Sequence, residues 1–274
     1  MTIRRQGIGD LWPRATPVVG MIHLLPLPGA PRWGGSMDAV VDRAMADAEA
    51  LTAAGFHGLM VENYSDVPFF GGSVPPETVA ALTAVASRIV AATDVPVGIN
   101  VLRNDAHAAL AIAVAVGARF VRVNVHTGSM FTDQGLLAGR AAHTLRLRRS
   151  LEADVAILAD VHVKHAVPPA GASLENSAAD AWHRGLADAL VVTGTGTGHP
   201  TDRTDADAVK RVVPEASVFV GSGVTVESVG SYLRTVDGLI VGSAVMQDGR
   251  AGAGVDPERA HAFMDAARRA AAGS

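Results

Sequence analysis

Short runs of β-branched and other apolar residues alternate with longer Ala-rich amphipathic stretches along the whole chain. Such alternation predicts a parallel sheet whose strands are joined by crossover helices. The pattern repeats eight times in about 250 residues, as a closed (β/α)₈ TIM barrel requires. The predicted strands span residues 17–24, 57–62, 96–102, 119–125, 155–161, 188–193, 217–221 and 237–241. The predicted helices span residues 36–54, 104–116, 134–151, 173–184, 205–213, 225–234 and 256–271, with one more that begins at Pro75.

The chain has no linker, low-complexity tract or internal repeat that would mark a second domain. We therefore expect a single barrel domain over residues 1–274, with a core at about 17–272 and residues 1–16 as an N-terminal extension. A doubly wound open sheet has the same alternation and is the alternative fold.

Composition excludes several classes of protein. Hydrophobic residues make up 49% of the chain and charged residues 18%, which rules out a disordered chain. The net charge of −4 gives no electrostatic reason to expect nucleic-acid binding. The chain contains no cysteine, as suits a cytoplasmic protein without disulfides or thiolate ligands. No signal-peptide pattern and no uninterrupted apolar run of about 18 residues occurs, so we expect no transmembrane segment.

Two small-residue loops follow the last two predicted strands. Gly221, Ser222 and Gly223 follow one strand, and Gly242 and Ser243 follow the next. Glycines let backbone N–H groups approach an anion, and this pair of loops commonly holds phosphate in barrels. We therefore expect a phosphorylated small molecule as ligand. The alternative is that each glycine only makes a tight turn.

A second cluster follows the fifth predicted strand. Asp160, His162 and Lys164 are spaced by two residues, which predicts that their side chains share one side of the strand. Of 23 basic residues only Lys164 and Lys210 are lysines, so a lysine here is unusual. The set suits proton transfer, carbonyl polarisation or metal ligation. A polar surface loop is the alternative.

Further polar residues end the second, third and fourth strands. Burial of the Glu62 carboxylate costs free energy unless the group is paired or functional. Asn63 follows it directly. Asn100 and Asn124 occupy equivalent positions and suit a substrate hydroxyl or phosphate, and Arg122 points to the same side as Asn124. An internal hydrogen-bond network with Glu62 is the alternative for Arg122.

The remaining candidates lie on the first, fourth and sixth strands and the loops that follow them. His23 and His126 lie at expected mouth positions and are candidates for acid–base chemistry or substrate orientation. Thr193 and Thr195 belong to a Gly/Thr-rich loop that covers substrate or is simply flexible. We expect no required cofactor. A divalent ion held by Glu62, Asp160 and His162 remains an alternative, although the spacings typical of zinc sites are missing.

A series of motifs in order resembles the BtpA/SgcQ family over about residues 17–250. These motifs are GMIHLLPLPGAP, VENYSDVPF, GINVLRND, RVNVHTG, LADVHVKHA, VVTGTGTG and VGSGV. The resemblance implies a fold like the ribulose-phosphate-binding barrels, with a phosphate ligand. One branch of the family is linked with photosystem I biogenesis and thylakoid membranes, and another is labelled a nucleoside triphosphatase.

Three hypotheses follow from the residues and the resemblance. The first is an enzyme that isomerises, epimerises or cleaves a phosphorylated sugar or nucleotide-like molecule by acid–base chemistry. The second is a metal-assisted hydrolase of nucleotides. The third is a non-enzymatic assembly factor that retains the barrel. We also expect a homo-oligomer, because barrels commonly assemble through their outer helices.

Overall fold

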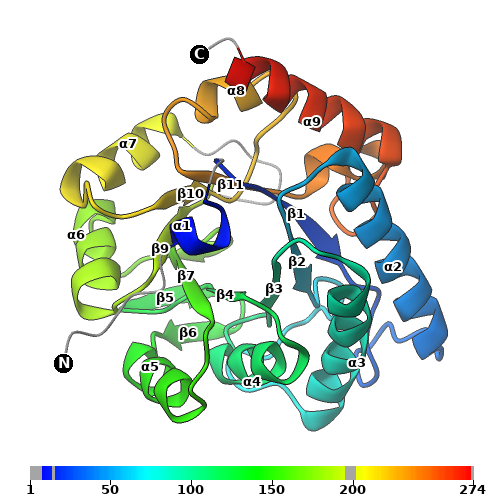
Figure 1. The fold of residues 1–274 in the computed structure, drawn as a ribbon. Coiled ribbons are helices and arrows are strands. Elements are labelled where there is room, and N and C mark those ends of the chain that lie inside the picture. Colours follow the sequence, from blue (N-terminus) through cyan, green and yellow to red (C-terminus); the bar gives the residue numbers. More distant parts are fainter. Residues whose placement is uncertain (1–7, 14–15, 195–201, 273–274) are drawn as a thin grey trace.

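Eight parallel strands close into a barrel in the computed structural model, which describes residues 8–13, 16–194 and 202–272 (Figure 1). The strands pair in the circular order β1-β11-β10-β9-β7-β4-β3-β2. The expected (β/α)₈ barrel is thus confirmed, and the open sheet is wrong. The strands are β1 (Val18–His23), β2 (Gly58–Glu62), β3 (Val97–Asn100), β4 (Phe120–Val123), β7 (Ala156–Val161), β9 (Ala189–Val192), β10 (Val218–Val220) and β11 (Gly238–Val241).

Helices surround the barrel, and local sequence signals set their ends (Figure 1). The Ser36 side chain accepts a hydrogen bond from the backbone N–H of Ala39 at the start of α2, and Gly55 ends that helix at φ 90°. The expected helix at residues 225–234 is reduced to the four residues of α8. The outer helices are α2 (Met37–Ala54), α3 (Pro76–Ala92), α4 (Ala106–Val116), α5 (Ala141–Ser150), α6 (Leu174–Ala179), which continues as a π-helical turn (Asp180–Arg184), α7 (Arg203–Val212), α8 (Val229–Tyr232) and α9 (Pro257–Ala272). No helix in the described part of the chain is long and apolar enough to cross a membrane.

The N-terminal extension closes one end of the barrel. Helix α1 (Ile8–Leu11) lies over that end in Figure 1, and Trp12 packs against Phe120 and Phe219 at ring-centroid distances of 5.4 and 6.1 Å. The two phenylalanines have room because each faces a glycine in register on the next strand, Gly98 and Gly238. A Cβ atom on Gly98 would lie 2.1 Å from the Phe120 ring. This end of the barrel is therefore filled with apolar side chains.

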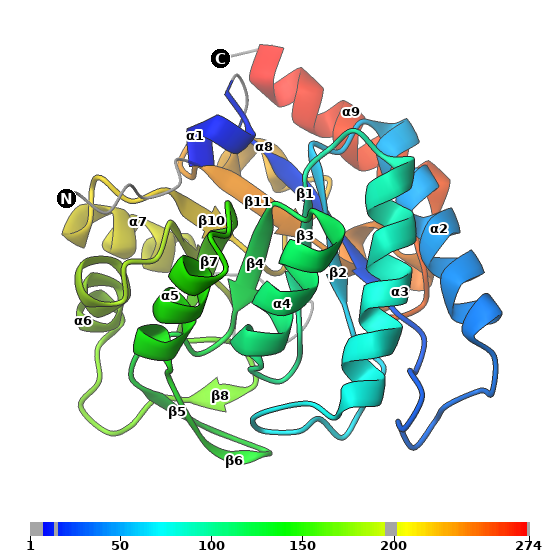
Figure 2. The same cartoon turned by 60° about the horizontal axis from the view of Figure 1, so that its bottom comes forward.

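The other end of the barrel differs from the expectation. The helix predicted to begin at Gln134 begins instead at Ala141, and a β-hairpin precedes it. The hairpin strands are β5 (Ser129–Thr132) and β6 (Gly135–Ala138), and the two-residue β8 (Ala166–Val167) pairs with β5. Figure 2 shows this small sheet at the end of the barrel opposite α1.

The predicted helix began too early, because burial in this segment alternates with the period of two that defines strands. Leu137 and Met130 are buried at 4% and 6% exposure, whereas Leu136 and Phe131 are 59% and 53% exposed. Gly135 has a φ of 94°, which suits the tight turn between the strands and not a helix. Alternating burial with a turn glycine defines a hairpin whose inner face packs over the barrel.

Candidate functional site

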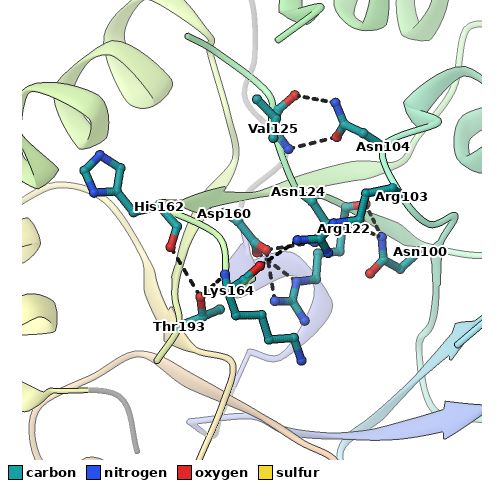
Figure 3. A network of polar contacts seen from close by, with 10 residues as sticks. All are labelled: Asn100, Arg103, Asn104, Arg122, Asn124, Val125, Asp160, His162, Lys164 and Thr193. Carbon is teal, nitrogen blue, oxygen red and sulfur yellow. Dashed lines mark hydrogen bonds and ion pairs between the residues drawn. The ribbon is translucent and has the colours of Figure 1, made fainter. Parts of the chain in front are cut away.

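An ion pair stands at the centre of the open end of the barrel. Arg122 on β4 donates from Nε to Asp160 Oδ1 at 2.8 Å and from Nη2 to Asp160 Oδ2 at 3.0 Å (Figure 3). Asn124 Nδ2 donates to the same Oδ2 at 2.8 Å, and Asn100 Nδ2 donates to the Arg122 carbonyl at 3.1 Å. The Asp160 carboxylate therefore accepts three hydrogen bonds. The internal network expected for Arg122 exists, but its carboxylate is Asp160 and not Glu62.

Glu62 ends β2 and lies apart from that network. Its side chain is buried, and no hydrogen bond to its carboxyl group occurs within the described ranges. Burial raises the pKa of Glu62, against the lowering effect of the nearby Lys164 charge. His23 Nε2 is 3.7 Å from Glu62 Oε1. A buried carboxyl group without fixed donors is free to exchange a proton with a ligand.

His23 is a neutral neighbour of Glu62. Its Nδ1 accepts a hydrogen bond from the Gly252 backbone N–H at 3.1 Å, so the ring proton resides on Nε2, which faces Glu62. Burial, followed by the charge of Lys164, lowers the pKa of His23 to about 3. The ring stacks on Tyr64 with centroids 4.2 Å apart. His23 therefore presents an N–H donor to the carboxyl group and carries no charge near neutral pH.

Lys164 comes from the segment that follows β7, and backbone contacts fix its position. Its N–H donates to Thr193 Oγ1 at 3.0 Å, and its carbonyl accepts from Arg103 Nη2 at 2.6 Å. The side chain is half-buried, and its amino group points away from the polar network in Figure 3. Burial, followed by the Arg122 charge, lowers the pKa of Lys164. The amino group has no ion pair or hydrogen bond with any described residue.

A pocket of about 640 Å³ lies at the open end of the barrel. Glu62, Arg103, Arg122 and Lys164 all contribute to its wall, and the exposed Arg32 lies at its rim. The pocket thus joins a carboxyl group of raised pKa to several cations. Acid–base chemistry on an anionic ligand suits such a wall.

The loop after β10 reaches the same end of the barrel. A Cβ atom on Gly221 would lie 3.3 Å from Arg122 Nη2, so this backbone passes directly beside the ion pair. Gly223 has a φ of 71°, a conformation that favours glycine, and Ser222 between them is buried.

The loop after β11 approaches from the next strand. A Cβ atom on Gly242 would lie 3.5 Å from His23 Cε1. Ser243 begins a short 3₁₀ turn, Ser243–Val245. Both loops expected to bind phosphate therefore border the polar residues of the barrel mouth.

The structure separates His162 from its expected partners. β7 ends at Val161, and His162 adopts a φ of 54°, so the alternation that would align it with Asp160 and Lys164 stops there. Its ring makes a hydrogen bond of 3.0 Å with Ser177 Oγ and lies on the far side of the segment from Lys164 in Figure 3. The predicted row of three side chains is therefore wrong at His162.

Two other candidates form local contacts outside the pocket. His126 is buried, and its Nε2 lies 2.8 Å from the Gly185 carbonyl. Asn63 accepts from the Leu102 N–H at 2.7 Å and donates to Asp66 Oδ2 at 3.1 Å. Thr193 holds the Lys164 backbone, as described above. Thr195 lies outside the described residues.

A metal site is not assembled from the candidate ligands. Within the described ranges, no three His, Cys, Asp or Glu side chains converge as metal ligands would. Glu62, Asp160 and His162 are therefore not a ligand set in this arrangement.

Arg103 is the site residue that the sequence analysis missed. It follows β3 in the run NVLRND, three residues after Asn100. Its side chain is only 4% exposed and lines the pocket beside Lys164. The available signal was that Arg103 directly follows the predicted strand 96–102. A charged residue at the end of a buried strand requires a partner or a function.

The fold and the site define a (β/α)₈-barrel protein with a charged pocket at the carboxyl ends of its strands. The chain belongs to the BtpA family, whose sequence model matches residues 14–269. It is 47% identical over 250 residues to the photosystem I biogenesis protein BtpA of Synechocystis sp., covering 91% of this chain and 87% of that protein. An uncharacterized protein of Thermococcus kodakarensis is 43% identical over 92% of this chain and 95% of its own length.

Solved structures support the same fold. Phosphoribosyl anthranilate isomerase from Thermococcus kodakaraensis superposes with a TM-score of 0.54 at 15% identity, covering 92% of this chain and 98% of that one. KGPDC from Streptococcus mutans superposes with a TM-score of 0.59 at 12% identity, covering 93% and 99%. At such low identity these similarities show the barrel fold alone.

Proposed function

We propose that this protein is an enzyme that acts on a phosphorylated small molecule by acid–base chemistry. The observation that carries the proposal is the placement of Glu62 and Lys164 in one pocket, neither of them neutralised by a direct ion pair. Buried titratable groups of opposite charge with shifted pKa values are typical of proton-transfer sites.

Glu62 is the proposed base. It removes a proton from a substrate carbon adjacent to a carbonyl group, and the electron pair of the C–H bond moves onto the carbonyl oxygen. A pKa raised above its ordinary value by burial makes the Glu62 carboxylate a better proton acceptor. Delivery of a proton to the opposite face of the same carbon by a second acid completes an epimerisation. Return of the proton from Glu62 to the former carbonyl carbon, while the substrate hydroxyl proton moves to the former carbonyl oxygen, completes an isomerisation.

Lys164 is the proposed electrostatic partner. Its ammonium group stabilises the negative charge that develops on the carbonyl oxygen, and the poorly solvated pocket strengthens this interaction. Asp160 accepts three hydrogen bonds from Arg122 and Asn124 and serves as a positioning residue in this proposal. The His23 ring, whose Nε2 lies 3.7 Å from Glu62 Oε1, is the proposed neighbour that orients this carboxyl group.

The loops after β10 and β11 are the proposed phosphate site. Their glycines lie next to Arg122 and His23, so a phosphate held there would place the rest of a small molecule over Glu62. Backbone N–H groups of Gly221, Ser222, Gly223, Gly242 and Ser243 are the proposed donors.

The test begins with a thermal-shift screen of ribose 5-phosphate, glycerol 3-phosphate, nucleotides and inorganic phosphate, each with and without Mg²⁺ or Mn²⁺. A ligand of the native state raises the melting temperature, and Gly223→Asp should abolish the shift because it adds a carboxylate to the phosphate site. If no phosphorylated compound changes the melting temperature, the proposal of a phosphorylated ligand is contradicted. A shift that requires the metal would favour the hydrolase hypothesis instead.

The chemistry is then tested by NMR in D₂O with the hit from that screen. The wild-type protein should exchange a substrate C–H proton for deuterium, and Glu62→Gln should slow this exchange about 10²–10⁴-fold without loss of binding. Glu77→Gln, on the first turn of α3, is the matched control and should leave the exchange unchanged. Exchange that survives Glu62→Gln would contradict the role of Glu62.

A second candidate function rests on the 47% identity to the Synechocystis biogenesis protein. In that case the protein assembles with other proteins and catalyses nothing. The outer face of the small sheet would suit such a role, because Phe131, Leu136 and Val167 are exposed there in one register. Absence of any phosphate ligand, together with a specific protein complex lost on Phe131→Ser, would favour this candidate.

A further inference from the structure

Two cations in the pocket form no direct ion pair in the described part of the chain, and Asp160 and Glu62 act on them only at longer range. Arg103 is 4% exposed, and its guanidinium group donates a hydrogen bond to a neutral group, the Lys164 carbonyl, at 2.6 Å. Lys164 likewise makes no ion pair. Buried charges are normally paired because desolvation without compensation is expensive.

The nearby acids do not supply this pairing. Asp160 is bound by both arms of Arg122 and by Asn124. Glu62 has a raised pKa and faces His23, and Asp133 at the pocket wall is exposed. The positive charge of Arg103 and Lys164 therefore remains available to a ligand.

The position of Arg103 differs from that of the proposed phosphate loops, and Lys164 comes from the segment after β7 to meet it. In the circular strand order, β3 and β4 lie across the barrel from β10 and β11. Arg103 follows β3, whereas the glycine loops follow β10 and β11. A ligand that fills the mouth would thus meet one anion site at each side.

We infer that Arg103 and Lys164 form a second anion subsite, and that the substrate is a phosphorylated carboxylic acid whose carboxylate binds there. A guanidinium group offers a planar donor pair that matches a carboxylate, and the adjacent ammonium adds a point charge. The inference rests on the proposed function, since it assigns the phosphate end of the same substrate to the β10 and β11 loops.

The test compares ligands that differ only in the carboxylate. 3-Phosphoglycerate is matched with glycerol 3-phosphate, and 6-phosphogluconate with glucitol 6-phosphate, by calorimetry on the full chain. In the wild-type protein at least one acid should bind about tenfold tighter than its partner without the carboxylate. Arg103→Gln should remove this preference and leave the affinity for the ligand without the carboxylate unchanged. Arg103→Lys, which keeps the charge, should restore part of it.

Controls separate this subsite from the phosphate site and from misfolding. Arg88→Gln removes the same charge from an exposed position on α3, outside the pocket, and should preserve the preference. Glycerate or gluconate binding that Arg103→Gln abolishes would support the subsite even if no phosphate binds, in which case only the phosphate proposal fails. Equal affinities within both pairs in the wild-type protein, or no binding of any of the four acids, would overturn the inference.

Discussion

Arg122 and Asp160 share two hydrogen bonds inside the barrel, from Nε to Oδ1 at 2.8 Å and from Nη2 to Oδ2 at 3.0 Å. Their side chains are 2% and 0% exposed. Each charge is therefore tolerated only because the other is present. The pair joins β4 to β7 and places Asn124 and Asn100 around it.

Removal of one partner should be costly. Asp160→Ala leaves the Arg122 charge buried and unpaired, so we expect the free energy of unfolding to fall by about 3–5 kcal/mol in urea titrations. The double variant Arg122→Met/Asp160→Leu removes both charges and should recover most of the loss. A single-variant loss below about 1 kcal/mol would show that water or another group already solvates Arg122.

His23 should make the fold sensitive to acid. Its pKa is lowered from 6.5 to about 3, so between these values the unfolded chain binds more protons than the native protein. Stability should therefore fall as the pH falls from 6.5 toward 3, with a contribution of about 4–5 kcal/mol from this residue at the low end. His23→Asn retains an acceptor for the Gly252 N–H and should flatten the dependence. Identical pH profiles for the two proteins would contradict this assignment.

Glu62 should act in the opposite direction. Burial raises its pKa above 4.5, so the native protein holds this proton to higher pH than the unfolded chain does. Stability contributed by the protonated form is present below pH 4.5 and is lost as the pH rises through the raised pKa. The free energy of unfolding, measured by urea titration, should therefore be higher for Glu62→Gln than for the wild-type protein at pH 7. The difference between the two proteins should be smaller at pH 4. An equal loss of stability at both pH values would instead assign Glu62 a structural role.

The glycine beside Phe120 should resist substitution. A Cβ atom on Gly98 would lie 2.1 Å from the Phe120 ring, so Gly98→Ala should destabilise the fold by about 1–3 kcal/mol. Phe120→Leu in the same chain should relieve part of this cost. Gly34→Ala is the matched control, since nothing lies within 4 Å of its Cβ position, and it should change stability by less than about 0.5 kcal/mol. Equal thermal midpoints for Gly98→Ala and Gly34→Ala would contradict the packing argument.

Much of the barrel was predictable from local pattern. The strand expected at 217–221 is Val218–Val220, and the strand expected at 155–161 is Ala156–Val161. The same alternation placed Glu62, Asn100 and Arg122 at one end of the sheet, where the structure has them. Prediction failed where the chain leaves regular strands. At His162 a left-handed residue breaks the alternation, and the second hairpin strand, Gly135–Ala138, lies where the helix 134–151 was expected to begin.

The sequence by itself determined the eight-fold alternation of strand and helix, and with it the barrel, because period and capping are local properties of the chain. Only the tertiary structure decided which polar residues form ion pairs and hydrogen bonds with one another. Asp160 pairs with Arg122 from another strand, and Arg103 reaches the Lys164 carbonyl across 61 positions of the chain. Such contacts depend on how strands are ordered around the barrel and where each loop turns. Local sequence patterns do not determine those spatial relations. They therefore do not predict the two cations without an ion pair in the pocket.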